Sequence, residues 1–409
     1  MSKIDDLIKE LCPNGVMHKA LWSLTTWDKR FNAVDNHKQP KVKKYFYFLA
    51  NDLKPLILKN GDIKILTTSV SNIYTSSKLV DSSRIAEGEV VCIPWGGNPI
   101  VQYYNGKFIT ADNRICFSND DTYLSNKYLY YVLTSKLDEI KTFYRGSGIK
   151  HPNMQKVLDL KIPVPPLEVQ KEIVRVLDSF TELEAELEAE LEARKKQYEY
   201  YRNDLLTFDE RVEWVSMSDI SVKISSGGTP KTSELSYYNG NIPWLRTQEI
   251  EFNEIWDTDI KITESGLKNS SAKVIPANCV IVAMYGATVG KSAVNKIPLT
   301  TNQACANIQV NPEVAYYRYV FHWISHNYKK IKSLGTGSQT NINAQIVKNF
   351  QIPIPSLEKQ KQIVSILDKF EKLTNDISVG LPAEIEARRK QYEYYRNKLL
   401  TFKELECSK

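Results

Sequence analysis

The chain has 409 residues, of which 42% are hydrophobic and 25% charged. This ordinary globular composition excludes wholesale disorder and a fibrous protein. No apolar run approaches the roughly 18–20 residues that span a bilayer, and the polar start of the chain lacks the apolar region of a secretory signal. The six cysteines form no CxxC pair, so we expect buried, reduced thiols in a cytoplasmic protein rather than a disulfide or zinc framework.

The net charge of +6 is unevenly distributed along the chain. Residues 1–165 hold 23 Lys and Arg against 16 Asp and Glu, whereas residues 166–208 hold 6 against 11. A basic region beside an acidic strip suits nucleic acid at one surface and protein at another, although charge alone is equally typical of unevenly solvated surfaces.

The first domain, residues 1–165, is predicted to be an α+β domain that binds nucleic acid. Residues 90–93 are a short buried strand followed by the loop Trp95-Gly96-Gly97-Asn98, and residues 124–145 predict a helix. Lys and Arg neutralise phosphates, while Asn and Gln contact base edges. We therefore expect DNA contacts from Lys43, Lys44, Asn98, Arg114, Arg145 and Lys150. For each residue the ordinary alternative is a surface loop without a ligand.

Residues 166–208 predict one long helix that begins after Pro165-Pro166. Apolar side chains recur on a heptad lattice over about five heptads, which is typical of a coiled coil about 60 Å long. The lattice includes Ile173, Leu177, Phe180, Leu187, Leu191, Tyr198 and Tyr201.

The second domain, residues 209–355, is also predicted to be α+β, with a buried strand at 279–283 and a helix at 316–333. Its Gly-, Asn- and Thr-rich loops carry the residue types that approach DNA closely. The expected DNA contacts are Thr229, Lys231, Arg246, Gln248, Lys291, Asn302, Gln303, Ser338 and Gln339.

A second spacer helix follows in residues 356–409, with a break near residues 380–382, where Gly380-Leu381-Pro382 stops and restarts a helix. We expect antiparallel pairing with the first helix, which would place the two domains at opposite ends about a pseudo-twofold axis. The alternative is that each helix docks separately on its own domain. The pairing residues are Ile363, Leu367, Phe370, Tyr392 and Tyr395.

The two halves of the chain are an internal repeat. Residues 161–180 match 351–370, and EARKKQYEYYRNDLLTF at 192–208 matches EARRKQYEYYRNKLLTF at 386–402. The domains that precede these helices share only scattered matching residues. Two near-identical helices indicate one structural task performed twice, and two divergent domains indicate related tasks on different targets.

A catalytic centre is not assembled in the sequence. Residues 286–292 have one residue too few between their glycines for a P-loop, and His322 and His326 lack the glutamate of an HExxH site. We expect both histidines on a solvated helix face. No catalytic residue or metal ligand is assigned, and the chain is predicted not to be an enzyme.

The chain resembles the specificity subunit of type I restriction-modification systems. The resemblance rests on the duplicated segments, on Ser226-Gly227-Gly228-Thr229-Pro230 with Tyr238-x-Gly240-x-Ile242-Pro243-Trp244, and on Tyr285-Gly286-Ala287-Thr288-Val289-Gly290. The first domain departs from the family, since it has Trp95-Gly96-Gly97-Asn98 in place of the last motif.

The resemblance implies an α+β protein with two target recognition domains on a coiled-coil spacer. Each domain would read one half of a split, asymmetric site in double-stranded DNA. The helices would carry two modification subunits, which bind S-adenosylmethionine and methylate adenine, and motor and nuclease subunits would join for cleavage. No cofactor is expected on this chain.

Two rival functions remain open on the sequence. A lone nuclease or methyltransferase would need cofactor or metal motifs, and binding of S-adenosylmethionine by the isolated chain would identify it. A coiled-coil scaffold without a nucleic-acid role would lack salt-dependent DNA binding.

Overall fold

The computed structural model describes residues 2–335, 341–376 and 378–405. The chain forms two compact units, one of residues 1–186 and 385–409 and the other of residues 187–384. Each unit therefore combines one domain with part of the long helix α7 (Leu167–Leu205) and a helix from the second spacer region. In the described ranges, no helix is both long and apolar enough to cross a membrane.

The first unit is built on a six-stranded sheet in the order β2-β7-β5-β6-β3-β4. Alternation along β5 divides its side chains between two cores. Val91 and Ile93 pack with the helices, whereas Val90 and Cys92 pack with Phe108 on the other face. The strands are β2 (Thr25–Trp27), β3 (Ile63–Leu66), β4 (Tyr74–Thr75), β5 (Ala86–Pro94), β6 (Gln102–Thr110) and β7 (Asn113–Ser118).

The second unit repeats this plan with a five-stranded sheet in the order β12-β19-β16-β17-β14 and a three-stranded sheet β15-β13-β18. Val280 and Val282 of β16 pack with the helices, and Ile281 and Ala283 pack on the opposite side. The strands are β12 (Ser221–Ser226), β13 (Tyr238–Leu245), β14 (Asn253–Ile255), β15 (Lys261–Ile262), β16 (Val280–Ala283), β17 (Ser292–Asn295), β18 (Thr300–Thr301) and β19 (Cys305–Val310).

Short helices cover one face of each sheet, and they divide the helices expected at 124–145 and 316–333. In the first unit these are α4 (Asn126–Ser135) and α5 (Leu137–Lys141), and in the second α9 (Tyr317–His326) and α10 (Tyr328–Ser333). The remaining short helices are α2 (Leu21–Leu24), α3 (Ala50–Leu53), α6 (Met154–Asp159), α8 (Glu264–Lys268) and α11 (Ala344–Asn349).

A two-stranded antiparallel ribbon leads into the long helix that follows each domain. In the first unit it pairs β1 (Met17–Ala20) with β10 (Lys161–Val164), and in the second β11 (Trp214–Ser216) with β20 (Gln351–Pro353). The first unit also has the hairpin β8 (Tyr144–Arg145) and β9 (His151–Pro152). Pro165 and Pro166 lie between β10 and α7, and Pro355 lies between β20 and Ser356, the N-cap of α12.

The second spacer region forms two helices, α12 (Leu357–Asn375) and α13 (Leu381–Leu400). Gly380 lies between them, and a Cβ atom there would come within 2.6 Å of the Lys372 carbonyl oxygen. Only glycine fits such a close backbone approach, which explains the residue type at this break.

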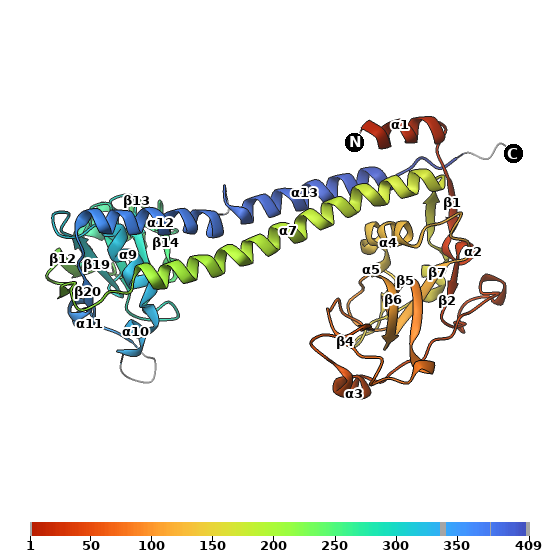
Figure 1. Cartoon of the computed structure of the whole chain (residues 1–409). Coiled ribbons are helices and arrows are strands. Elements are labelled where there is room, and N and C mark those ends of the chain that lie inside the picture. The colour runs from red at the N-terminus through yellow and green to blue at the C-terminus, as the bar shows by residue number, and fades with distance from the viewer. Residues whose placement is uncertain (1, 336–340, 377, 406–409) are drawn as a thin grey trace. The chain divides into compact units, whose positions relative to one another are not determined.

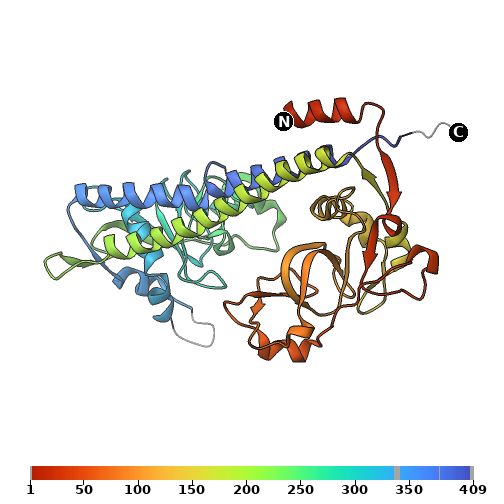
Figure 2. The ribbon, with the colours of Figure 1, turned by 45° about the vertical axis from the view of Figure 1, so that its right-hand side comes forward.

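The long helices pack side by side in each unit through one aromatic cluster (Figures 1 and 2). In the first unit Phe180 of α7 stacks on Tyr395 of α13 with ring centres 5.5 Å apart, and Tyr392 lies beside it. Arg389 lies against Glu184, so the two helices run antiparallel. The predicted antiparallel coiled-coil pairing is thereby confirmed.

The same cluster recurs in the second unit. Phe370 of α12 stacks on Tyr201 and Tyr198 of α7, with ring centres 5.5 and 6.1 Å apart. The remaining predicted pairing residues are partly or fully buried. Ile173, Leu177, Ile363 and Leu367 also contact the domain cores, while Leu187 is buried and Leu191 half-buried.

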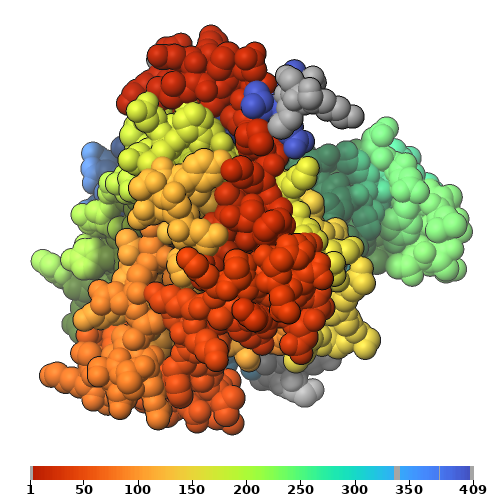
Figure 3. Space-filling view, turned by 90° about the vertical axis from the view of Figure 1, so that its right-hand side faces the viewer, coloured from red at the N-terminus to blue at the C-terminus, as the bar shows by residue number. Residues whose placement is uncertain are grey.

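An extra helix, α1 (Ser2–Leu11), belongs to the first unit alone. Ile4 is fully buried in its core, and Lys3 reaches Glu172 of α7 over 3.4 Å. Figure 3 shows the red atoms of α1 directly over the yellow-green start of α7. Val16, after α1, exchanges backbone hydrogen bonds of 2.9 Å with the segment Lys403–Leu405.

The cysteines follow the sequence prediction as far as the structure describes them. Cys12, Cys92, Cys116, Cys279 and Cys305 are free and buried, and Cys407 lies outside the described residues. Burial, and after it the charge of Asp28, raises the pKa of Cys92 to about 12. These thiols are therefore protonated core side chains.

Candidate nucleic-acid interface

Three loops of the second domain meet where β12, β13 and β18 end. The Gly228 amide donates to the Thr301 carbonyl over 2.9 Å, and the Asn302 amide donates to the Leu245 carbonyl over 2.9 Å. Trp244 Nε1 donates to the Gly228 carbonyl over 2.9 Å. A Cβ atom on Gly227 would lie 2.1 Å from the Thr301 carbonyl oxygen, so glycine is required for the loops to approach each other.

This junction gathers five of the predicted DNA contacts. Thr229 bonds Gln303, and Asn302 lies beside it on the same loop. Arg246 follows Leu245 and is held near Glu249 at 3.8 Å. With the Gln248 amide oriented so that its oxygen accepts, Arg246 Nη2 donates to it over 2.8 Å. The group offers the guanidinium, amide and hydroxyl functions that read base edges.

The other predicted contacts of the second domain are less clearly part of this junction. Lys231 is exposed and directly follows Pro230. Lys291 instead pairs with Glu251 and lies 5.9 Å from the Phe252 ring centre. Ser338 and Gln339 lie outside the described residues.

In the first domain, the loop after β5 meets the β8–β9 hairpin. The Gly97 amide donates to the Lys150 carbonyl over 3.0 Å, and His151 Nδ1 lies 2.7 Å from the Trp95 carbonyl oxygen. This contact brings together the exposed side chains of Asn98, Arg145 and Lys150. A polar and basic surface suited to a phosphate backbone results.

Arg114 lies beneath this surface rather than on it. It is 6% exposed, and its guanidinium lies 4.3 Å from the Trp95 ring centre and 3.5 Å from Asp28. Burial raises the pKa of Asp28, and the hydrogen bond from Tyr47 and the charge of Arg114 act against that rise. The structure therefore gives Arg114 a packing role under Trp95, and a direct DNA contact is not favoured by this geometry.

The side chains of Lys43 and Lys44 are exposed, and the Lys43 amide donates to the Trp27 carbonyl over 3.0 Å. The Lys43 ammonium lies 5.3 Å from the Phe117 ring centre and 5.6 Å from that of Tyr45. Lys29 is a further cation that the sequence did not single out. It is exposed, and its ammonium lies 5.1 Å from the Trp95 ring centre. No motif marks Lys29, because its proximity to Trp95 arises only in the folded chain.

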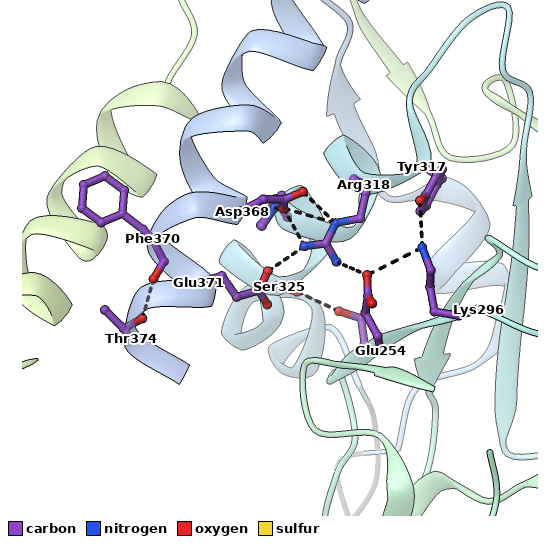
Figure 4. A network of polar contacts seen from close by, with 11 residues as sticks. Glu254, Lys296, Tyr317, Arg318, Ser325, Asp368, Phe370, Glu371 and Thr374 are labelled. Carbon is purple, nitrogen blue, oxygen red and sulfur yellow. Dashed lines mark hydrogen bonds and ion pairs between the residues drawn. The ribbon is translucent and has the colours of Figure 1, made fainter. Parts of the chain in front are cut away.

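An ion cluster around the buried Arg318 joins the second domain to α12 (Figure 4). Arg318 of α9 contacts Asp368 at 2.5 Å, Glu371 at 2.6 Å and Glu254 at 3.6 Å. Burial would raise the pKa of Asp368, but hydrogen bonds from His322 and Arg318 and the charge of Arg318 lower it below its ordinary value. The cluster thus fixes the carboxylate in its charged form.

The prediction of a solvated His322 is wrong. The residue is 1% exposed and its Nε2 lies 2.6 Å from Asp368, because α9 is packed between the sheet and α12. His326 is half-buried. His322, Asp368 and Glu371 have ligand atoms within 4.8 Å of one another. Arg318 already bonds both carboxylates, so this cluster is built around a guanidinium and does not favour a metal ion.

The first unit docks its domain on α7 at the equivalent position, Asp178. Tyr131 donates to Asp178 over 2.5 Å, and Lys127 pairs with it at 2.9 Å. A buried glutamine is common to both units. Gln170 donates to the Pro165 carbonyl and Gln360 to the Pro355 carbonyl, both over 2.8 Å.

Comparison with known proteins places the chain in a family. The family model described as the type I restriction modification DNA specificity domain matches residues 37–193 and 210–387. The chain is 39% identical over 301 residues to the EcoR124I/EcoR124II specificity subunit of Escherichia coli, covering 70% of this chain and 73% of that one. It is 32% identical over 339 residues to a putative type I specificity subunit of Haemophilus influenzae, covering 77% and 83%.

The fold is also that of a solved specificity subunit. The type I S subunit from M. genitalium aligns with a TM-score of 0.61 at 16% identity, covering 94% of this chain and 96% of that one. The resemblance seen in the sequence is confirmed, and the chain belongs to the type I restriction-modification specificity subunits, which recognise DNA and do not themselves catalyse a reaction.

Proposed function

We propose that this chain reads a bipartite, asymmetric DNA site in the cytoplasm, one half with each domain, while its long helices carry two modification subunits. S-adenosylmethionine would bind to the modification subunits, and motor and nuclease subunits would join the assembly for cleavage. The relatives are named as restriction-enzyme specificity subunits, and one solved neighbour comes from work on complex assembly of a type I system.

The contrast between helix junctions and loops carries this proposal. In both units a glutamine and an aspartate of the spacer helices bond the domain from equivalent positions. The loops that present polar and basic side chains differ in residues and in contacts, as Trp95-Gly96-Gly97 and Gly227-Gly228-Thr229 illustrate. Equivalent supports with different loops are what two readers of different half-sites require.

The second-domain junction has the chemistry of direct base readout. Arg makes paired hydrogen bonds to guanine, and Gln or Asn makes them to adenine, in the major groove. Arg246 is braced by Glu249 and Gln248, so its guanidinium is ordered before DNA arrives. A braced side chain loses less conformational entropy on binding than a free one.

Substitution at this junction tests the proposal. Arg246→Ala with Gln303→Ala, in the chain assembled with its modification subunits, should relax methylation at one or two positions of one half-site. Each lost bidentate contact should cost about 1–3 kcal/mol of discrimination. Lys231→Ala is the matched control, because loss of a phosphate contact weakens binding without changing the sequence read. Unchanged sequence preference in the double variant would contradict the assignment.

The cofactor assignment has its own test. The isolated chain should not bind S-adenosylmethionine in calorimetry, whereas the assembly with modification subunits should bind it. Binding by the isolated chain would favour the rival function of a lone methyltransferase.

A further inference from the structure

We propose that a pocket in the second unit binds a small molecule that joins a phosphate group to a planar ring, such as a nucleoside monophosphate. The pocket has a volume of about 310 Å³, at the lower end of the range of small-molecule sites. Its walls come from α7, α9, α10, α12 and the residue before β14, all within residues 187–384. The lining residues that carry the inference are Tyr198, Arg202, Phe252, His326, Tyr328 and Lys329.

Three basic side chains from three helices line the pocket. They are Arg202 of α7, His326 of α9 and Lys329 of α10. The Arg202 Nε atom is buried and has no hydrogen-bond partner among the described residues. Burial, and after it the charge of Arg202, lowers the pKa of His326, because a neighbouring positive charge disfavours the protonated ring. A phosphate group would give Arg202 its missing acceptor and would offset this repulsion.

The acidic residue of the pocket is already neutralised. Glu371 of α12 lies 2.6 Å from Arg318 in an ion pair (Figure 4). The charge that the pocket offers a ligand is therefore positive. Residues 166–208, which include the α7 wall, hold 11 acidic against 6 basic side chains. Acidic surroundings disfavour a nucleic-acid strand, so a small free anion suits this recess better than a DNA backbone.

Aromatic side chains form the apolar part of the pocket. Tyr198 is held in place by its stack on Phe370, with ring centres 6.1 Å apart. Phe252 and Tyr328 meet edge to face, with ring centres 5.3 Å apart. Such rings stack on planar bases without regard to the identity of the base. Basic and aromatic groups in one recess match the two parts of a nucleotide.

The backbone of Phe252 is strained. Its φ is +59°, in the left-handed region that a bulky side chain rarely adopts. The turn is held by Asn253, whose side chain accepts from the Glu251 amide over 2.9 Å and donates to the Glu249 carbonyl over 3.3 Å. Residues in such conformations cluster at ligand sites, where the surrounding structure holds them. The strain here places an aromatic ring in the wall of a basic pocket.

The basic residues of the pocket are not repeated in the first unit. Helices α4 and α9 align through the tyrosines that donate to the ribbon carbonyls. In that alignment Ser135 takes the place of His326, and Asp138 takes the place of Lys329. Asp138 pairs with Lys141 over 2.7 Å. The site is thus a feature of the second domain rather than of the repeated helices.

Calorimetric titration of the full chain tests the inference. The modification subunits are left out, because they would bind nucleosides themselves. AMP is the probe, and inorganic phosphate and adenosine each supply one of its parts. We expect AMP to bind at one site more tightly than either part. Lys329→Glu, which introduces the charge found in the first unit, should weaken the binding of AMP and of phosphate roughly tenfold or more.

Lys330→Glu is the matched control, since Lys330 is the next residue of α10, is exposed and does not line this pocket. It should leave the affinity for AMP unchanged. Phe252→Asn tests the ring, because asparagine tolerates the left-handed backbone. This variant should keep the wild-type affinity for phosphate and should bind AMP no more tightly than phosphate.

Four results would overturn the inference. The first is a wild-type chain that does not bind AMP at millimolar concentration. The second is an unchanged affinity for AMP in Lys329→Glu, which places the nucleotide elsewhere. The third is an equal loss in Lys330→Glu, which indicates surface charge alone. The fourth is phosphate binding as tight as AMP binding in the wild-type chain, which removes the ring from the site. None of these results bears on DNA reading, which is tested on the assembled complex.

Discussion

The two units attach their domains to the helices with the same geometry and with different chemistry. Asp178 accepts from a tyrosine and a lysine in the first unit, whereas Asp368 accepts from a histidine and an arginine in the second. Both units retain the glutamine, and both retain a tyrosine that donates to a ribbon carbonyl: Tyr128 to Pro163 in the first unit and Tyr319 to Pro353 in the second. What must be kept is therefore the backbone position of the domain, while the charged groups around it are free to change.

The largest expected effect comes from shortening α7 while α12 and α13 keep their lengths. Residues 182–193 are ELEA three times over, and the second copy has no such repeat. Deleting residues 186–189 removes about 6 Å of helix and about 40° of rotation, while Leu191 takes the place of Leu187. Since DNA rises about 3.4 Å per base pair, we expect the unread spacer to shorten by one or two base pairs with both half-sequences unchanged. Mapping methylated sites measures this, and an active variant with the original spacer would exclude a ruler role.

Removing the charged partner of Asp368 should destabilise the second unit more than the matched change destabilises the first. Arg318→Ala removes a buried guanidinium that bonds three half-buried carboxylates, and it should destabilise the second unit by about 1–3 kcal/mol. The matched change Lys127→Ala removes a partly exposed ion pair and should cost about 0–1 kcal/mol. Hydrogen exchange in α9 and α4 reads the two units separately. Equal losses would show that the two junctions are energetically alike.

Substitution of the equivalent glutamines of the two units should destabilise each unit by a similar amount. Gln170→Ala and Gln360→Ala each leave buried backbone groups unpaired, at about 1–3 kcal/mol. Exchange rates in the strands of each unit would report the losses. A large cost in one unit and none in the other would break the equivalence on which the comparison rests.

The smallest effect is a dependence on acid in the second unit. The pKa of Asp368 is lowered in the folded chain, so its contribution to stability is complete above the ordinary aspartate pKa of about 3.9 and is lost as the pH falls through the lower folded value. Asp368→Asn should flatten this dependence. Hydrogen exchange of α9 between about pH 5 and pH 3 would detect it, and an identical profile in the variant would refute the assignment.

The helices and the repeat could be predicted because both are local patterns. The heptad spacing of Ile173, Leu177 and Phe180 indicates the paired face directly, and the buried strands at 90–93 and 279–283 follow from short apolar runs. The binding loops could be named only as candidates. Thr229 and Gln303 are 74 residues apart and meet through sheet topology that no spacing reveals.

Two polar residues illustrate why side-chain environment was harder to predict. Arg114 lies between the buried residues Asn113 and Ile115 of β7, and its burial depends on the distant partners Asp28 and Trp95. His322 is predicted on a solvated face because the sequence lacks the glutamate of an HExxH metal site, yet α12 covers that face with Asp368. In both cases a charge supplied by another element makes the burial tolerable.

The most direct test of the central claim is an exchange of one domain. Residues 209–350 are replaced with the second domain of another specificity subunit, the chimera is expressed with its modification subunits, and methylated sites are mapped genome-wide. The account predicts that one half of the recognised sequence changes while the other half and the spacer length stay the same. A change in both halves, or in neither, would contradict independent reading by the two domains.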